Sequence, residues 1–104
     1  MASANISQKT RYGVYKRDGF QCALCGCHDG LQIHHAIPRG KGGGNTVENL
    51  ITLCDKCHAQ AHGIDCYPGV VDQRDVQHAC VEYLADMYTT VERDGTTKTW
   101  DPYA

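Results

Sequence analysis

The sequence predicts a small α+β domain in which a β-strand, a glycine-rich loop, a second extended segment and a helix are held together at their base by two cysteine pairs. Three observations lead to this fold class. Cys-x-x-Cys pairs stand at residues 22–25 and 54–57, an alternating apolar run lies between them, and apolar residues recur at helical spacing near the C-terminus. With 104 residues, of which 41% are hydrophobic, the chain has room for one compact core.

The cysteines favour a metal site over disulfides. There are seven of them, an odd number, and the N-terminus lacks the pattern of an export signal. A two-residue spacer lets both sulfurs of a pair reach one ion, and four thiolates at about 2.3 Å are typical ligands of structural zinc. The predicted zinc ligands are Cys22, Cys25, Cys54 and Cys57. Cys27 is an alternative ligand, a redox-active pair is an alternative interpretation of the motif, and Cys66 and Cys80 are expected in a loop and in the core.

The segment between the two pairs predicts a strand, a loop and a helix. Glycines before and after the first pair indicate zinc-ribbon-like knuckles, whose backbone N–H groups point at the thiolates. Residues 31–37 are expected to form a β-strand, on which His34 and His35 face opposite sides. Pro38 ends this strand and starts a mobile basic loop that extends to Asn45. The remaining predicted elements are a helical turn at 46–50, a short strand at 51–53 and a helix at 56–62 capped by Asp55.

The segments before and after this unit are predicted to differ in how much regular structure they contain. Residues 1–10 are expected to be a flexible N-terminus, and residues 11–63 the main domain, which starts with a short helix or turn. In the extension at 64–104, an amphipathic helix is predicted at about 72–91, capped by Asp72 and stopped by Asp94-Gly95. Its apolar stripe consists of Val76, Ala79, Cys80, Tyr83, Leu84 and Met87. The tail, which contains Trp100, is expected to dock on the domain or to meet a partner.

Charge is unevenly distributed along the chain. The net charge is −2, which by itself argues against nucleic-acid binding. Residues 1–62, however, carry seven Lys and Arg against four Asp and Glu, whereas residues 63–104 carry three against eight. The first part is therefore expected to face phosphate. No apolar run is long enough to span a membrane, and we expect an intracellular, cytoplasmic protein without membrane contact.

Histidines gather between and just after the cysteine pairs. On the predicted strand, one of His34 and His35 can bind a metal while the other transfers a proton. His58 and His62 are four residues apart, and so share one face of the predicted helix. Asn49 offers a carbonyl that can accept a hydrogen bond from an imidazole N–H and fix its tautomer. The alternative is an inert zinc-binding module in which these histidines have only structural roles.

The ordered combination of these motifs resembles the HNH endonuclease family. The resemblance is carried by the first Cys-x-x-Cys pair, Leu-Gln-Ile-His-His-Ala-Ile-Pro at 31–38, Gly-Gly-Gly-Asn at 42–45 and Glu-Asn-Leu-Ile-Thr-Leu-Cys-Asp-Lys-Cys-His at 48–58. Arg11 and residues 15–22 resemble the segment that leads into the family motif, so the resemblance covers roughly residues 11–62. It implies a ββα-metal (His-Me finger) core.

The resemblance also implies roles for individual residues. His35 is expected to be the general base, with Asn49 orienting the base and its loop. His34 and His58 match the ligands of a catalytic divalent ion, which could be Mg²⁺, Mn²⁺, Ni²⁺ or Zn²⁺. His62 matches a histidine that ligates metal only in some branches of the family, and its role stays open between metal ligand and phosphate contact.

The implied reaction is hydrolysis of phosphodiester bonds in DNA, expected to be double-stranded, leaving 5′-phosphate and 3′-hydroxyl ends. Arg39 and Lys41 are the predicted phosphate contacts, because a basic glycine-rich loop can follow a nucleic-acid backbone. Weaker candidates are Arg11, Lys16 and Arg17. Small members of the family often occur in phages, so a partner such as phage packaging machinery is expected by analogy. The alternative function is a non-catalytic module: either a zinc-binding nucleic-acid module that keeps the cysteines but does not need His35 and Asn49 together, or an assembly protein that acts through residues 64–104.

Overall fold

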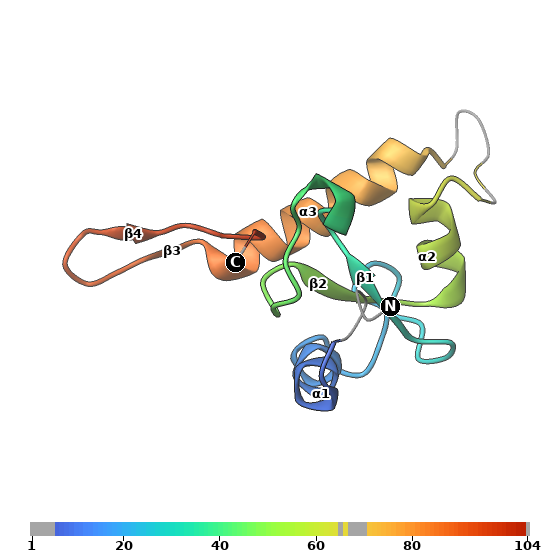
Figure 1. The fold of residues 1–104 in the computed structure, drawn as a ribbon, viewed down its shortest axis with the longest axis horizontal. Helices are drawn as coiled ribbons and strands as arrows, with labels where there is room; N and C mark the ends of the chain where they lie inside the picture. Colours follow the sequence, from blue (N-terminus) through green and yellow to red (C-terminus); the bar gives the residue numbers. More distant parts are fainter. Residues whose placement is uncertain (1–5, 65, 67–70, 104) are drawn as a thin grey trace.

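The computed structural model describes residues 6–64, 66 and 71–103. Its elements in chain order are α1 (Gln8–Arg17), β1 (Gln32–His35), the 3-10 helix η2 (Arg39–Lys41), β2 (Leu50–Leu53), α2 (Asp55–Ala61), α3 (Gln73–Tyr88), β3 (Thr90–Val91) and β4 (Thr97–Lys98). The hairpin β1–β2 leads directly into α2, which is the α+β arrangement of a ββα-metal core and confirms the predicted fold class (Figure 1). Within the described residues, no helix is both long and apolar enough to cross a bilayer.

The β1–β2 hairpin is the centre of the domain. The strands are antiparallel, with the pairs Gln32–Leu53, Ile33–Thr52, His34–Ile51 and His35–Leu50. All four residues of β2 are buried, because α1 contacts this strand while Ile51 and Leu53 belong to a core cluster shared with α2 and α3. β1 ends two residues earlier than predicted, since the peptide of Ile37 bonds to the side chain of Asn49 instead of to a strand.

Three further local predictions differ from what the structure shows. Helix α2 starts one residue early, because the sulfur of Cys54, and not the carboxylate of Asp55, accepts the N-cap bond from the amide of Cys57 at 3.5 Å. Helix α1 begins at Gln8, within the segment predicted to be flexible, because Ser7 caps it. Residues 46–49 form a single hydrogen-bonded turn instead of a helical one, with Asn49 N–H donating to Thr46 O at 3.0 Å.

Helix α3 is close to the prediction at its start and shorter at its end. Asp72 is the N-cap, and its carboxylate accepts from the amide of Arg74 at 2.7 Å. The helix stops at Tyr88, because the β-branched residues that follow favour extended backbone. Asp94-Gly95, the predicted helix stop, forms the turn of the β3–β4 hairpin instead. After β4 the chain returns to the loop that precedes β2 (Figure 1).

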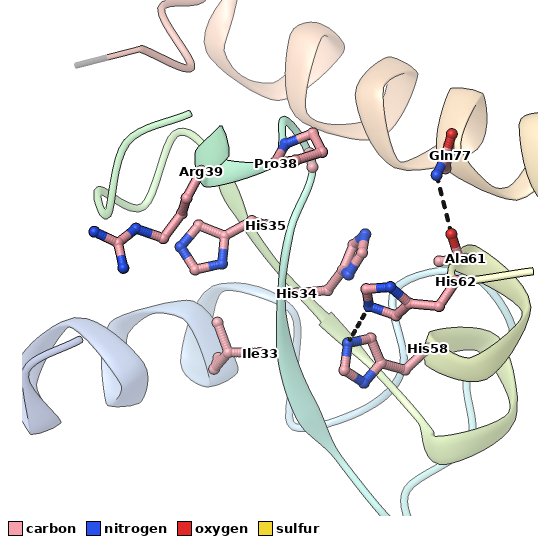
Figure 2. Close-up of a pocket in the computed structure, with 10 residues that line it drawn as sticks. Ile33, His34, His35, Pro38, Arg39, His58, Ala61, His62 and Gln77 are labelled. Atoms are coloured by element: carbon pink, nitrogen blue, oxygen red, sulfur yellow. Dashed lines mark hydrogen bonds between the residues drawn. The ribbon is translucent and has the colours of Figure 1, made fainter. Parts of the chain in front are cut away.

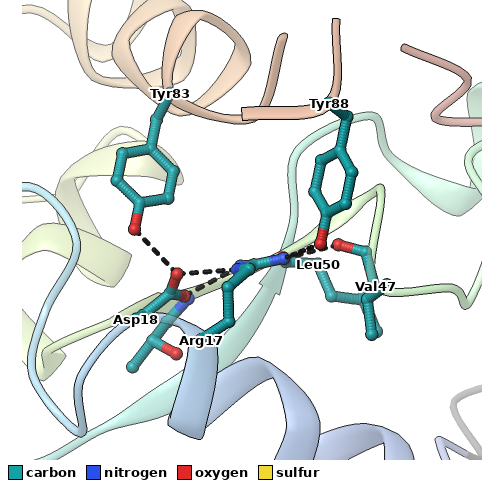
Figure 3. Close-up of polar contacts among 7 residues, drawn as sticks. Arg17, Asp18, Val47, Leu50, Tyr83 and Tyr88 are labelled. Atoms are coloured by element: carbon teal, nitrogen blue, oxygen red, sulfur yellow. Dashed lines mark hydrogen bonds and ion pairs between the residues drawn. The ribbon is translucent and has the colours of Figure 1, made fainter. Parts of the chain in front are cut away.

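Arg17, a weak candidate for phosphate contact, is instead a structural residue between α1, β2 and α3 (Figure 3). Only 14% of its side chain is exposed. The guanidinium donates to both carboxylate oxygens of Asp18 at 2.8 Å, to the carbonyl oxygens of Val47 and Leu50 at 2.7 Å each, and to the Tyr88 hydroxyl at 3.1 Å. All its donors are therefore engaged by the protein, and it is not available to a ligand.

Asp18 completes this buried cluster. Its carboxylate also accepts from the Tyr83 hydroxyl at 2.8 Å (Figure 3). It accepts in addition from the amide of Thr52 at 2.9 Å. Burial alone would raise the pKa of Asp18, but the hydrogen bonds from Arg17 and Thr52 and the charge of Arg17 outweigh it, so the pKa lies below its ordinary value. Burial and the contact with Asp18 raise the pKa of Tyr83 to about 12. The cluster thus contains a carboxylate and a neutral phenol at neutral pH.

We expect Asp18→Asn to lower the free energy of unfolding by about 3 kcal/mol, because it leaves the buried guanidinium of Arg17 without its counter-charge. A carboxyl group whose pKa is depressed by folding contributes its full stabilisation above its unfolded pKa and loses it only as pH falls through the folded value. The difference in free energy of unfolding between wild type and variant, measured by urea unfolding, should therefore stay constant from pH 8 to pH 5.5. The exposed Asp86→Asn variant is the control, and a gap that shrinks within this window would contradict the prediction.

Candidate metal centres

The four predicted cysteines form one cluster. Their sulfur atoms all lie within 4.8 Å of one another, and the Sγ atoms of Cys25 and Cys54 are 3.6 Å apart. In a tetrahedral site with metal–sulfur bonds of about 2.3 Å, sulfurs are separated by about 3.8 Å, so the arrangement suits such an ion. Cys27, the alternative ligand, is exposed and outside the cluster, with its thiol directed at the carbonyl of Asp29. The arrangement suggests a structural zinc site.

The backbone around the cluster favours thiolates. Burial would raise the pKa of Cys22, but the backbone N–H groups of Cys25, Cys54 and Leu24 lower it to about 7. Gly26, at φ 80°, closes the turn by donating to the carbonyl oxygen of Cys22 at 2.9 Å. Burial and the adjacent sulfur of Cys22 raise the pKa of Cys57. Because neighbouring thiolates repel one another, complete ionisation of the four requires a bound cation, which is how metal binding becomes coupled to folding.

A second cluster consists of three imidazoles. His34 comes from β1, His58 from α2 and His62 from the C-cap of α2, and one nitrogen of each ring lies within 4.8 Å of the others (Figure 2). The Nε2 atoms of His58 and His62 are 3.2 Å apart, against about 3.4 Å expected for two ligands of one tetrahedral ion. Burial, and then the nearby histidines, lower the pKa of His34 to about 4. Its ring is neutral at pH 7, which is the form that binds metal.

His35 lies on the opposite side of β1, next to Arg39 and away from the other three rings (Figure 2). Its Nε2 atom is 2.7 Å from the side-chain oxygen of Asn45. Because this oxygen is an acceptor, Nε2 carries the proton and Nδ1 keeps a lone pair. A pocket of about 260 Å³ is lined by residues that include His34, His35, Arg39, His58 and His62. The structure thus brings the three-histidine cluster and His35 to one opening.

Asn49 differs from the expectation that its carbonyl accepts from a histidine ring. The side chain is fully buried, its oxygen accepts from the amide of Ile37 at 2.7 Å, and its NH₂ group donates to the carbonyls of Ile37 and Gly44 at 3.0 Å. All three contacts are to the backbone of the loop between the strands. A β-carbon at Gly43 would collide with the carbonyl of Ile37 and the amide of Asn49, so this close approach requires glycine. Asn49 therefore holds the loop, and Asn45 contacts His35.

Sequence reasoning missed a hydrogen-bonded chain behind His58. Nδ1 of His58 contacts the side-chain oxygen of Gln32, whose NH₂ group donates to the carboxylate of Asp55 at 2.5 Å. The carboxylate fixes the orientation of the Gln32 amide, and the amide oxygen then requires a proton on Nδ1 of His58. Its Nε2 lone pair is left to face His62. The strand alternation, which places Gln32 and His34 on one face, was the available signal.

The predicted phosphate contacts lie on η2 and are exposed. Arg39 lines the histidine pocket, while Lys41 lines an adjoining hollow together with Arg74 of α3. Of the weaker candidates, Lys16 is exposed and Arg11 donates to the carbonyl oxygen of Ile6 at 3.3 Å. Of the predicted cations, Arg39 is thus the one that shares a pocket with the histidines, and Lys41 lies in the neighbouring hollow.

Comparison with known proteins identifies the family of this site. The HNH endonuclease family model matches residues 22–63, which contain all seven residues of the two clusters. Anaredoxin of Nostoc is 32% identical over 56 residues, which cover 53% of this chain and 74% of that protein. The chain belongs to the HNH endonuclease family. Within it, β1, β2 and α2 correspond to the matched segment, and α3 and the β3–β4 hairpin lie beyond it.

Two further relatives are much longer than this HNH protein. The type IV methyl-directed restriction enzyme EcoKMcrA of Escherichia coli is 44% identical over 32 residues, which cover 31% of this chain and 12% of the enzyme. The CRISPR-associated endonuclease Cas9 of Corynebacterium diphtheriae is 38% identical over 52 residues, which cover 46% of this chain and 5% of that protein. The similarity to both proteins is therefore confined to a small part of each.

We expect Cys54→Ser to release the metal of the four-cysteine cluster and to abolish cooperative unfolding, because structural zinc contributes about 10–16 kcal/mol to small domains of this kind. Metal content by mass spectrometry and thermal unfolding by circular dichroism measure the two effects. Cys27→Ser is the matched control, since Cys27 is adjacent to the knuckle but outside the cluster. A Cys54→Ser protein with full metal content and unchanged melting would contradict the assignment.

Gln32→Met should weaken metal binding at the histidine cluster by about 10- to 100-fold, because His58 loses the acceptor that fixes its tautomer. Zinc-loaded protein titrated with Ni²⁺ in a calorimeter gives the dissociation constant of the second site. Gln8→Met, at an exposed position on α1, is the control. Equal affinities for the two variants would show that the chain through Gln32 does not support the site.

Proposed function

We propose that this HNH protein is a divalent-metal-dependent endonuclease that hydrolyses DNA phosphodiester bonds and leaves 5′-phosphate and 3′-hydroxyl ends. The observation that carries the proposal is a single pocket that contains three clustered imidazoles and a fourth, His35, outside the cluster. Metal-assisted hydrolysis needs both kinds of group near one another: ligands for an ion that stabilises developing charge, and a base that accepts a proton from water. The names of two relatives, a restriction enzyme and a CRISPR-associated endonuclease, support the same reaction class.

The ion of this site would be held by His34 and His58, with His62 as a third ligand. Three protein ligands leave positions open for substrate and water, as a catalytic site requires. Mg²⁺, Mn²⁺, Ni²⁺ or Zn²⁺ would supply Lewis acidity, which withdraws charge from a phosphate oxygen as the new bond to phosphorus forms. The neutral state of His34, due to its burial, keeps the ligand competent at neutral pH.

His35 is assigned the role of general base. With Nε2 bonded to Asn45, its Nδ1 lone pair accepts a proton from the attacking water. Its place on the other side of β1 keeps this nitrogen out of the metal cluster, where it would be consumed as a ligand (Figure 2). Asn49 acts indirectly: it does not contact His35 but holds the loop on which Asn45 lies.

Double-stranded DNA is the proposed partner, contacted through Arg39 and Lys41. Both cations are exposed, and Arg39 lines the histidine pocket while Lys41 lines the adjoining hollow. The four-cysteine cluster is assigned a structural Zn²⁺ that ties the two knuckles together. A cytoplasmic location and a partner such as phage packaging machinery stay predictions from the sequence and the family resemblance.

A second candidate function is a non-catalytic zinc-binding module. It is favoured by one comparison, since anaredoxin, of which this chain covers 74%, does not have the name of a nuclease. The two functions differ at His35, because a general base is needed for hydrolysis and not for metal binding.

We expect His35→Ala to lower the rate of DNA cleavage by about 10²- to 10⁴-fold, the usual contribution of a general base. Metal content and DNA binding should be unchanged, because the ring is needed only on the way to the transition state. Plasmid nicking with and without added Mg²⁺ or Mn²⁺, paired with fluorescence anisotropy on labelled duplex DNA, measures both. His28→Ala is the control, since His28 is exposed and outside the pocket.

Other results would decide against the proposal. Nicking by His35→Ala at the wild-type rate would remove the assigned base. Wild-type protein that binds metal at both clusters but does not cleave DNA, RNA or single strands would favour the non-catalytic module.

A further inference from the structure

The last residues described, Trp100–Tyr103, dock on the loop between β1 and β2, and we name them the C-terminal clasp. The indole Nε1–H of Trp100 donates to the carbonyl oxygen of Glu48 at 2.6 Å. The carbonyl oxygen of Pro102 accepts from the amide of Gly44 at 2.9 Å. Pro102 is buried and Trp100 is half-buried. Of the two alternatives predicted for the tail, the structure has the one in which it docks on the domain.

The clasp is connected to His35 through consecutive contacts. Gly44 is held from both sides, because its N–H donates to Pro102 and its carbonyl accepts from Asn49 at 3.0 Å. The next residue is Asn45, whose side-chain oxygen is 2.7 Å from Nε2 of His35. The position of the Asn45 side chain therefore depends on a peptide unit that the clasp and Asn49 fix together.

The part of this loop from Gly44 to Glu48 needs outside support because its own backbone bonds are few. Three successive glycines occupy positions 42–44, and ordering each backbone unit costs about 1–2 kcal/mol of conformational entropy. The amides of Gly42 and Gly43 donate to the carbonyl oxygens of Arg39 and Pro38 in the first half of the loop. From Gly44 to Asn49, the backbone bond that the loop makes to itself is the turn from Asn49 to Thr46. Arg17 holds the loop at Val47, and the clasp holds it at Gly44 and Glu48.

The β3–β4 hairpin explains how the clasp reaches the loop. It projects from the end of α3 and then directs the chain back toward the domain, where Trp100 and Pro102 meet the loop (Figure 1). Its pairs Thr90–Lys98 and Val91–Thr97 make the return possible within a few residues. None of these residues lies in the segment 22–63 that the family model matches.

We propose that Trp100 and Pro102 are positioning residues for His35: they hold Gly44 and Glu48 so that Asn45 stays bonded to the imidazole and presents it in one tautomer and one orientation. The C-terminal extension thereby takes part in the reaction without touching substrate or metal. The role in cleavage rests on the proposed function, whereas the effect of the clasp on the loop and the ring does not.

The test uses full-length, zinc-loaded protein. Trp100→Phe keeps an aromatic ring and removes the donor to Glu48, and a chain that ends at Asp101 removes the acceptor of Gly44 while it keeps Trp100. Val91→Ala, at a position in the hairpin that is 75% exposed, is the control. The measurements are amide hydrogen exchange at Gly44, ¹⁵N spectra of the His35 ring, metal content, and kcat and KM for cleavage of duplex DNA.

In both clasp variants we expect at least tenfold faster exchange at Gly44 and a His35 ring that loses its single tautomer. We expect kcat to fall about tenfold while KM and metal content stay at the wild-type values. Asn45→Ala should lower kcat by a similar factor, and the double variant Trp100→Phe/Asn45→Ala should be no slower than Asn45→Ala alone, because both changes break one chain of contacts.

The results that would contradict the clasp differ from those that would contradict the proposed function. Unchanged Gly44 exchange and His35 spectra in both variants would overturn the clasp. Losses in kcat that multiply in the double variant would show that Trp100 acts by another route. If the wild type does not cleave DNA, the proposed function fails, while exchange and ring spectra still decide whether the clasp positions His35. If Trp100→Phe loses its metal and unfolds, the chain that ends at Asp101 still shows whether the clasp positions His35.

Discussion

The convergence of four cysteine sulfurs is the constraint on which the rest of this molecule depends. A two-stranded hairpin is only marginally stable by itself. The cysteine cluster supports β1–β2 by joining the knuckle at 22–25 to the start of α2, directly after β2. Because the sulfur of Cys54 also caps α2, the same atom that joins the cluster sets the first turn of the helix. His58 and His62 follow one and two turns later, which places both over His34.

The site depends equally on β1, because a strand separates two chemical functions. One face presents His34 to the imidazoles of His58 and His62, and the other presents His35 to Asn45. In this way His35, to which we assign proton transfer in the proposed function, lies outside the three-histidine cluster, although it is adjacent to His34 in sequence. Asn49 supports both by fastening the intervening loop to the end of β1.

The region after α2 is bound to the domain at several points. Tyr83 and Tyr88 of α3 contact Asp18 and Arg17, and Trp100 contacts the loop before β2. These contacts are polar and largely shielded from water, so they are directional and depend on correct placement of each partner. A small HNH core thus receives from its own C-terminal segment the support that its few secondary-structure elements do not supply.

The sequence by itself determined what depends on spacing along the chain. Two-residue spacers in the cysteine pairs, alternation at His34 and His35, the four-residue interval between His58 and His62, and the cap of α3 are short-range features with a fixed geometric meaning. Only the tertiary structure decided the burial of Arg17, the pairing of His35 with Asn45, the chain through Gln32 to Asp55 and the docking of Trp100. Each of these joins residues ten to seventy-one positions apart, and a partner that distant leaves no periodic trace in the sequence, because packing and not local backbone geometry selects it.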